Sequence, residues 1–241
     1  MQINVRAGQA HRLAWFLTRV LLAPKIDKLL GRMRREDAAV DYVLRNAPAG
    51  NPQAVLRAMD TFATQRRWMM NVGPQKGKVL ADALLGARAQ RVLEIGAYCG
   101  YSATLMGSQL SGAAASLVSI EKNPLYARIA RRIVAHAGLA PRVEVLTGTL
   151  AQYLATFQEP FDVVFLDHWK EEYFADLKRL EEGSLLRPGT TVVADNVGLF
   201  NVPDYLDYVR TSPRYASTFH ETGVEYQEQL HDGIEVSVFH G

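Results

Sequence analysis

Residues 161–170 read FDVVFLDHWK, an apolar run that ends abruptly in an acid, an imidazole, an indole and an amine. An apolar run of this length between polar residues is typical of a strand buried on both faces, as in a parallel sheet. In an open α/β sheet, ligands bind just beyond the carboxyl ends of the strands. Asp167, His168, Trp169 and Lys170 are therefore predicted to lie at a ligand-binding edge.

A second buried run, residues 190–194 (TTVVA), ends in the same way, in Asp195 and Asn196. Other strands are predicted near 91–95, 116–120 and 143–146, and helices near 36–47, 52–65, 75–87, 101–110, 123–137, 149–157, 172–183 and 203–211. This alternation predicts βαβ units, with a mostly parallel sheet and helices on both faces. Asp232-Gly233 separates two strand-like runs and predicts an antiparallel hairpin that turns at 231–233.

The composition is that of one ordinary globular domain of 241 residues. A nucleic-acid partner would need a basic, aromatic-rich surface, which a net charge of +2 does not offer. Cys99 is the only cysteine, so no intrachain disulfide can form. A single cysteine favours a reducing compartment, which here predicts a cytoplasmic protein.

Residues 1–35 are predicted to form an extension ahead of a catalytic domain at 36–241. Residues 13–23 (LAWFLTRVLLA) are apolar, but Arg19 interrupts them and they cover about half of the ~20 residues that a membrane-spanning helix needs. One interpretation is an amphipathic helix packed on the domain or on a second subunit. The other is interfacial membrane attachment, with Trp15 and Phe16 inserted and the flanking basic residues on lipid headgroups.

The segment from Glu94 to Ser102, EIGAYCGYS, follows the first central strand and opens a helix. Its two glycines are spaced Gly-x-x-x-Gly, so it lacks the middle glycine that lets a dinucleotide pyrophosphate approach the backbone. Glu121 ends the next strand, about 21 residues beyond Gly100, where an acid can bind ribose hydroxyls. The pattern predicts S-adenosylmethionine rather than a nicotinamide dinucleotide. The alternative is that the glycines merely close a tight turn.

Asp167, Asp195 and Asn196 supply three oxygen ligands without a competing His/Cys cluster. Such hard donors suit Mg²⁺ better than Zn²⁺ or iron. Lys170 lies three residues beyond Asp167, close enough to act on the same substrate. These residues predict that a metal chelates two adjacent oxygens of a substrate while the lysine removes a proton from one of them. Singly, each acid could instead cap a helix.

These motifs resemble the catechol O-methyltransferase family. The matching segments are WMMNVG from Trp68, the EIGAYCGYS segment, FLDHWK from Phe165, ADNV from Ala194 and Glu225-Tyr226. The resemblance extends from about residue 36 to the C-terminus. It implies the Rossmann-like class I methyltransferase fold, an α/β fold with seven strands and an antiparallel C-terminal hairpin. It also implies S-adenosylmethionine, Mg²⁺ and methyl transfer to one hydroxyl of a catechol.

The resemblance also implies a role for each matched residue. Asp167, Asp195 and Asn196 would hold Mg²⁺, Lys170 would be the general base, and Glu225 would accept a hydrogen bond from the hydroxyl that is not methylated. Trp68 would wall the catechol ring, with Asp167, Lys170, Asn196 and Phe200 also at the substrate. The cofactor would be surrounded by Met70, Val72, Glu94, Gly96, Tyr98, Ser102, Glu121, Asp167, His168 and Trp169.

Two positions depart from the family pattern. Leu150-Ala151 replaces the Ser-Gln pair that touches the adenine in the family, and Phe200 stands where the family has a proline against the catechol ring. A monomer or weak homodimer is expected. Two alternatives remain: a methyltransferase for another vicinal-diol aromatic, such as a caffeoyl-type phenylpropanoid, and a non-enzymatic interaction protein on the same fold.

Overall fold

The computed structural model describes residue 3 and residues 8–241 of the chain. The N-terminal helices are α1 (Ala10–Leu17), the π-helical η1 (Thr18–Leu22), α2 (Ala23–Leu29), α3 (Arg35–Asn46), α4 (Pro52–Gln65) and α5 (Gly73–Gly86). The central part contains β1 (Arg91–Ile95), α6 (Tyr101–Gln109), β2 (Ser116–Glu121), α7 (Pro124–His136), β3 (Val143–Thr147), α8 (Leu150–Tyr153) and the 3₁₀ turn η2 (Leu154–Thr156). The C-terminal part contains β4 (Val163–Leu166), η3 (Lys170–Glu172), α9 (Tyr173–Glu182), β5 (Thr191–Ala194), α10 (Pro203–Thr211), β6 (Tyr215–Val224) and β7 (Gln227–Phe239).

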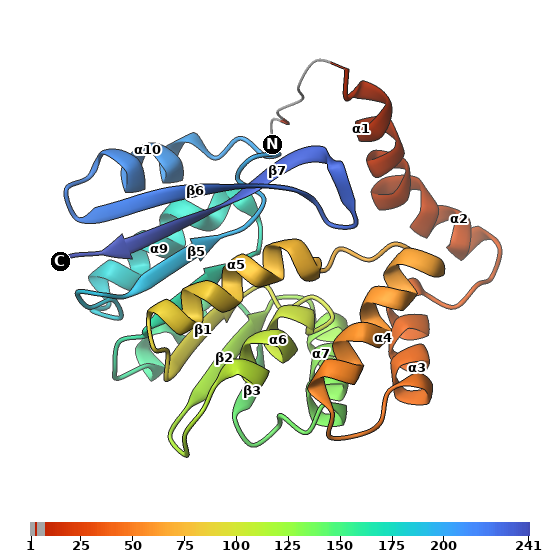
Figure 1. Cartoon of the computed structure of the whole chain (residues 1–241), viewed down its shortest axis with the longest axis horizontal. Coiled ribbons are helices and arrows are strands. Elements are labelled where there is room, and N and C mark those ends of the chain that lie inside the picture. The colour runs from red at the N-terminus through yellow and green to blue at the C-terminus, as the bar shows by residue number, and fades with distance from the viewer. Residues whose placement is uncertain (1–2, 4–7) are drawn as a thin grey trace.

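These elements form a three-layer α/β fold around one seven-stranded sheet (Figure 1). The strand order is β3-β2-β1-β4-β5-β7-β6; the first five strands are parallel, and β7 is antiparallel to both β5 and β6. The predicted fold class is therefore confirmed, and each of the five predicted parallel strands is present within one residue of its predicted ends.

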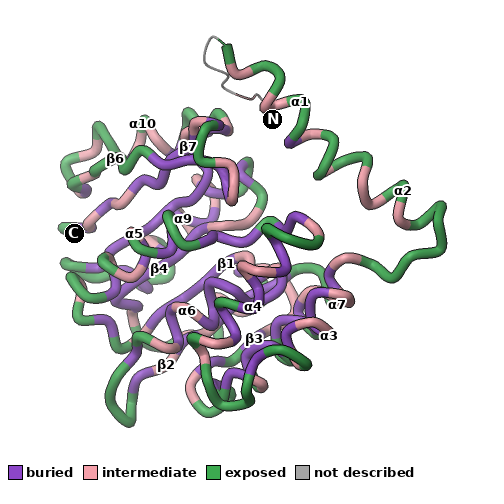
Figure 2. The backbone as a smooth tube through the Cα atoms, turned by 45° about the vertical axis from the view of Figure 1, so that its right-hand side comes forward, coloured by how far each residue is buried: buried purple, intermediate pink, exposed green. Residues whose placement is uncertain are grey.

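The core lies on both faces of the sheet because side chains alternate along each strand. In β4, Val163 and Phe165 join the cluster beneath α4–α7, whereas Val164 and Leu166 join the cluster beneath α9 and α10. All four side chains are fully buried, which explains why this strand is a continuous apolar run rather than an alternating one. The buried residues follow the sheet and the inner helix faces in Figure 2.

The predicted turn at 231–233 is wrong. Strand β7 runs straight through these residues, and the hairpin turns at Glu225 and Tyr226, where Tyr226 has a φ of +56°. Asp232 pairs with Thr222 across the hairpin, and its carboxylate is buried in a polar cluster on α5 and β5. Gly233 leaves room for the Phe219 ring of β6. The Asp-Gly pair is therefore explained by two long-range contacts, the buried polar contacts of Asp232 and the Phe219 ring against Gly233, rather than by a turn.

The N-terminal helices extend along one side of the molecule (Figures 1 and 2). The predicted helix at 13–23 is present but continues to Leu29, since a π-helical segment precedes Pro24 at the start of α2. Phe16 is buried and packs edge-to-face on Trp68, with ring centroids 5.5 Å apart. This contact agrees with the first interpretation, a helix packed on the domain.

Candidate active site

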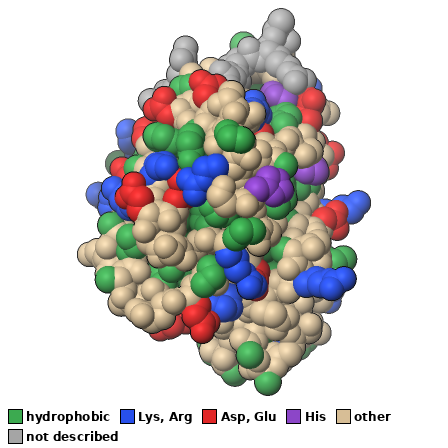
Figure 3. Space-filling view, turned by 90° about the vertical axis from the view of Figure 1, so that its left-hand side faces the viewer, with side chains coloured by type: hydrophobic (Ala, Val, Ile, Leu, Met, Phe, Trp, Pro, Cys, Tyr) green, Lys and Arg blue, Asp and Glu red, His purple; other side chains and the backbone are tan. Residues whose placement is uncertain are grey.

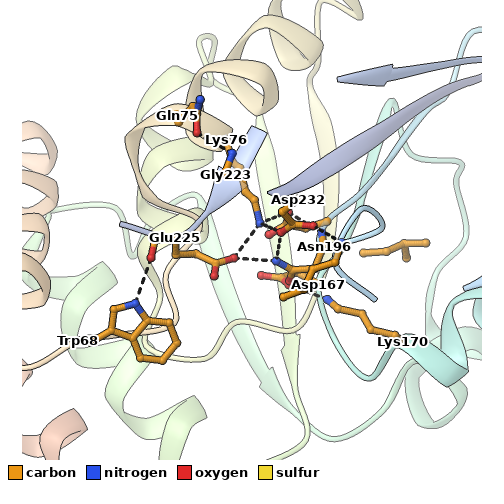
Figure 4. A network of polar contacts seen from close by, with 12 residues as sticks. Trp68, Gln75, Lys76, Asp167, Lys170, Asn196, Gly223, Glu225 and Asp232 are labelled. Carbon is orange, nitrogen blue, oxygen red and sulfur yellow. Dashed lines mark hydrogen bonds and ion pairs between the residues drawn. The ribbon is translucent and has the colours of Figure 1, made fainter. Parts of the chain in front are cut away.

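The parallel topology brings the polar residues after β4 and β5 to one edge of the sheet (Figure 4). Asp167 follows Leu166, and Asp195-Asn196 follow Ala194, which is the register partner of Leu166. Glu225 reaches the same place from the β6–β7 turn. The predicted metal ligands and both predicted catalytic residues, Lys170 and Glu225, therefore meet in one buried cluster.

Sequence reasoning missed the cation at the centre of this cluster, Lys76 on α5. Its ammonium lies 2.8 Å from Asp195 Oδ1, 2.8 Å from Glu225 Oε1 and 2.5 Å from Asp232 Oδ2, and its side chain is 1% exposed. The sequence does contain a pattern that indicates a buried lysine, because Lys76, Leu80 and Leu84 are spaced i, i+4, i+8 on one face of α5. A lysine on the apolar stripe of a helix must find buried partners.

Three carboxylates around one ammonium shift several pKa values. The pKa of Lys76 is raised well above its ordinary value, since Asp195, Asp232 and Glu225 together outweigh the opposing effect of burial. Burial raises the pKa of Asp195 to about 8 despite the Lys76 ammonium, and repulsion from Asp167 adds to the rise. Burial also acts to raise the pKa of Asp232, but the ion pair and hydrogen bond with Lys76 lower it overall.

The oxygens of Asp195, Glu225 and Asp232 lie within 4.8 Å of one another, as in a metal site, but Lys76 pairs with all three. The predicted metal ligands, Asp167, Asp195 and Asn196, fit a metal ion better than these three acids do. Asp195 Oδ1 accepts hydrogen bonds from Lys76 and from the Asn196 backbone, whereas its Oδ2 is buried without a partner among the described residues. A buried carboxylate oxygen without a donor is a site for a cation.

The amide of Asn196 is also oriented so that its oxygen is available to a cation. Its Nδ2 donates to Glu225 Oε1 at 2.7 Å and to Asp232 Oδ2 at 2.8 Å, which uses both amide protons and turns the amide oxygen away from these acids. Four carboxyl groups in the cluster, those of Asp167, Asp195, Glu225 and Asp232, face two amines, those of Lys76 and Lys170. Acids in excess of amines, with carboxylate and amide oxygens as donors, fit a divalent cation.

Lys170 lies on the other side of Asp167 and is held by two partners. Its Nζ donates to Asp167 Oδ1 at 3.2 Å and to the hydroxyl oxygen of Tyr173 at 2.7 Å. Burial raises the pKa of Tyr173, which keeps the hydroxyl protonated. Its proton is directed at the backbone oxygens of Leu166 and Asp195, at 2.8 and 3.0 Å. Tyr173 thus connects the Lys170 amine to the ends of β4 and β5. Sequence reasoning missed this role.

The glycine turn after β1 lies against the same strand end. Gly96 has a φ of +107°, and a Cβ there would collide with the backbone carbonyl of Asp167. Glu121 holds the turn, since its Oε2 accepts from the Tyr98 backbone N–H at 2.8 Å. The Tyr98 ring points away, because its hydroxyl donates to Glu36 on α3.

Glu94 is the most unusual residue at this turn. It is fully buried; one carboxylate oxygen accepts a hydrogen bond from Ser119, while Oε1 has no partner among the described residues. Burial raises the pKa of Glu94 to about 8, and its hydrogen bonds with Ser102 and Ser119 offset only part of the effect. An unpaired buried acid oxygen suits a cationic ligand group, such as an ammonium.

The other predicted cofactor residues differ in exposure. Val72 is buried, whereas Met70 is 45% exposed and Trp169 is 67% exposed. His168 packs against Tyr173, and its Nε2 lies 3.0 Å from Asp176 Oδ2. The structure therefore places His168 beside the site rather than among the predicted metal ligands.

On the predicted substrate side, Trp68 is fixed by its indole N–H, which donates to the Glu225 backbone oxygen at 3.0 Å. The partly buried Phe200 packs in the same apolar cluster as Trp68 and Phe16. Figure 4 shows Glu225 between Trp68 and the Asp167–Lys170 pair. Apolar side chains thus lie beside the polar cluster of Asp167, Lys170 and Glu225.

The chain also matches known proteins. Residues 93–197 match the sequence family described as "Methyltransferase domain". The zebrafish (Danio rerio) protein catechol O-methyltransferase B is 40% identical over 92% of this chain and 85% of its own length. A Bacillus cereus O-methyltransferase, solved with S-adenosylhomocysteine, is similar with a TM-score of 0.63, 25% identity and coverage of 95% of this chain and 97% of its own.

A further similar structure is the Streptomyces achromogenes O-methyltransferase TomG, solved with S-adenosylmethionine. Its TM-score is 0.67 at 26% identity, over 77% of this chain and 90% of its own. The chain belongs to the catechol O-methyltransferase family and is an S-adenosylmethionine-dependent O-methyltransferase.

Proposed function

We propose that this protein transfers a methyl group from S-adenosylmethionine to one hydroxyl of a catechol, and that the reaction depends on Mg²⁺. The observation that carries the proposal is the buried Asp195 Oδ2, which has no partner among the described residues and lies at the sheet edge that also holds the Lys170 amine. Asp167, Asp195 and Asn196 would hold the metal. When bound, Mg²⁺ would supply a Lewis acid that makes a neighbouring hydroxyl more acidic.

The residues of the chain then have separate roles. Lys170, held by Asp167 and Tyr173, accepts the proton of the reacting hydroxyl. The catechol oxygen attacks the methyl carbon, and the carbon–sulfur bond breaks to leave the neutral sulfide S-adenosylhomocysteine. Glu225 accepts a hydrogen bond from the second hydroxyl, and Lys76 and Asn196 orient its carboxylate. Holding both reactants in line supplies much of the rate acceleration.

The remaining predicted residues complete the proposal. Trp68 and Phe200 wall the catechol ring, together with Asp167, Lys170 and Asn196 at its oxygens. Glu94 and Ser102 take the charged amino-acid end of the cofactor, and Glu121 takes the ribose. Gly96, backbone atoms of Tyr98, Met70, Val72, His168 and Trp169 surround the rest of the cofactor.

The departure at 150–151 affects the adenine end. Leu150 is fully buried, and Gln152 is engaged in capping α8, where its Oε1 accepts from the Thr149 backbone N–H at 2.8 Å. We therefore propose that the adenine is held mainly by apolar contacts in this chain. The departure at Phe200 places an aromatic side chain against the apolar cluster that contains Trp68.

We also propose that residues 1–35 form an extension that covers the substrate wall, through Phe16 on Trp68. Of the helices in the described residues, none has the length and hydropathy to cross a bilayer. Contact with a membrane surface, a cytoplasmic location and a monomeric or weakly dimeric state stay predictions.

The test is Lys170→Ala, with the exposed lysine variant Lys78→Ala as the matched control. Loss of a positioned base is expected to lower kcat by about 10²–10⁴-fold. The dissociation constant for S-adenosylmethionine, measured calorimetrically, should stay within about twofold, since the partners of the amine are Asp167 and Tyr173 and not Glu94. Unchanged turnover would show that Lys170 is not the base. Loss of cofactor binding would show that the cofactor and base positions are misassigned.

A further inference from the structure

Two cavities meet at Trp68, on the side of the N-terminal helices. One, of about 230 Å³, is lined by Arg19, Arg32, Arg35, Arg66 and Arg67 together with Ala23, Ile26, Asp27 and Trp68. The other, of about 320 Å³, extends from Trp68 to Tyr226 and Gln227. Arg19 and Arg66 line both cavities. Nothing in the proposed methyl transfer uses these arginines.

The charge of the first cavity is unbalanced. Asp27 is the only acid in its lining, and it pairs with Arg67 at 2.5 Å and with Arg32 at 3.6 Å. Arg35 has a partner outside the lining, since its Nε donates to Glu36 at 2.8 Å. Arg19 and Arg66 form no ion pair within the described part of the chain. A concave surface lined by one sign of charge attracts the opposite sign.

This concentration of arginine is local. On the opposite side of the molecule, the surface in Figure 3 carries basic and acidic side chains interspersed. Around the cavity, Arg19 lies over the Trp15 ring at 4.8 Å and Arg35 over the Trp68 ring at 5.7 Å. Stacking of this kind restrains guanidinium groups, whose flat geometry favours two-point contacts with a carboxylate or phosphate.

The position of Trp68 connects the cavities to the proposed active site. Its indole N–H is bonded to the backbone of Glu225, whose side chain belongs to the polar cluster, while its ring lines both cavities. Because Trp68, Arg19 and Arg66 line the same cavities, a substrate ring that packs on Trp68 would lie beside the two arginines. A cationic substituent would be repelled there.

We propose that Arg19 and Arg66, which line both cavities, bind an anionic substituent of the substrate. The preferred catechols then carry a carboxylate or a phosphate. The proposal rests on the proposed function, because it assigns the substrate class of the same site. It makes Arg19 and Arg66 specificity-determining residues that act on substrate binding and do not take part in the methyl transfer itself.

The test compares catechols of equal size and different charge. Steady-state KM is measured for 3,4-dihydroxyphenyl carboxylic acids with side chains of zero, one and two methylenes, and for their neutral methyl esters. A catechol with a phosphate monoester and one with a primary amine complete the series. The acids are expected to have KM values at least about tenfold below their esters at low salt, and the amine the highest KM. Tenfold corresponds to about 1.4 kcal/mol. The phosphate and carboxylate arms identify which anion is favoured.

The double variant Arg19→Gln/Arg66→Gln should reduce the ester-to-acid KM ratio to about one. Arg19→Lys/Arg66→Lys should restore part of the ratio, because it keeps the charge but loses the two-point contact. Arg57→Gln, an exposed arginine on α4 outside both cavities, is the matched control and should keep the full ratio. Raising the salt concentration should lower the ratio in the unmodified protein.

Equal KM values for acids and esters, or an unchanged ratio in the double variant, would overturn the proposal. In either case turnover of the neutral esters would show that catechol methylation itself stands. If no member of the series is methylated, the result would instead contradict the proposed function.

Discussion

Replacing Lys76 by methionine tests how the buried cluster is held together. Methionine has a similar volume but no charge, so Asp195, Glu225 and Asp232 lose their shared ammonium while the packing of α5 is preserved. Removing one partner of a buried ion pair costs about 3–5 kcal/mol. A second route gives a similar figure: protonating one ordinary aspartate at pH 7 takes about three pH units, or about 4 kcal/mol.

The free energy of unfolding of Lys76→Met is therefore expected to fall by about 3–5 kcal/mol at pH 7, a large share of the 5–15 kcal/mol typical of a folded domain. The loss should be smaller at pH 5. Without the ammonium, burial raises the folded-state pKa of Asp232 above its unfolded value and raises that of Asp195 further. Stability arising from their protonated forms is present at low pH and lost as pH rises through those folded pKa values.

The assay is guanidinium denaturation followed by circular dichroism, with a chelator present so that no metal contributes. A loss of this size should move the midpoint by about 1 M. Lys78→Met is the control, because Lys78 is exposed on the same helix and its replacement should stay within about 0.5 kcal/mol. A Lys76→Met protein within about 1 kcal/mol of the unmodified protein at pH 7 would refute the role given to the ammonium.

Three further outcomes are expected. Burial raises the pKa of Glu94 to about 8, and binding the cofactor ammonium favours the carboxylate form, so cofactor affinity should rise by up to about tenfold per unit between pH 6 and 7.5. Calorimetry on Glu94→Gln should show a flat profile, and an unchanged slope would contradict this. Gly96→Ala should lower stability by about 1–3 kcal/mol, because the new Cβ collides with the Asp167 carbonyl. Gly86→Ala, where a Cβ meets nothing within 4 Å, should not, as thermal unfolding of both variants will show. Phe16→Ala should increase amide hydrogen exchange in α1 at least about tenfold, since Phe16 is its only buried side chain; unchanged exchange would mean that other contacts hold the helix.

The strands and the edge at which the site lies were predictable because their signals are local. A buried parallel strand must be apolar on both faces, so the change from Leu166 to Asp167 marks its end within the sequence itself. The same holds for Ala194 and Asp195. The two glycines of the turn after β1 were also a local signal, although the requirement for Gly96, clearance of the Asp167 backbone, comes from a distant segment.

The wrong turn prediction and the missed Lys76 both concern contacts between segments that are distant in the sequence. Asp232-Gly233 has the composition of a turn, but the pair is used to reach Lys76 on α5 and to admit the ring of Phe219. Lys76 itself is separated from its partners by more than a hundred residues of sequence. A local pattern shows that a buried lysine needs an acid but does not show which acid.

The most direct measurement of the central claim is methyl transfer from labelled S-adenosylmethionine to catechol, with resorcinol as the control whose hydroxyls are not adjacent. We expect the label in the monomethyl ether of catechol, with one S-adenosylhomocysteine per product. Activity should be lost in excess chelator, recovered when Mg²⁺ is added, and absent with resorcinol. Undiminished transfer in chelator, or equal methylation of resorcinol, would contradict the metal-held diol on which the account depends.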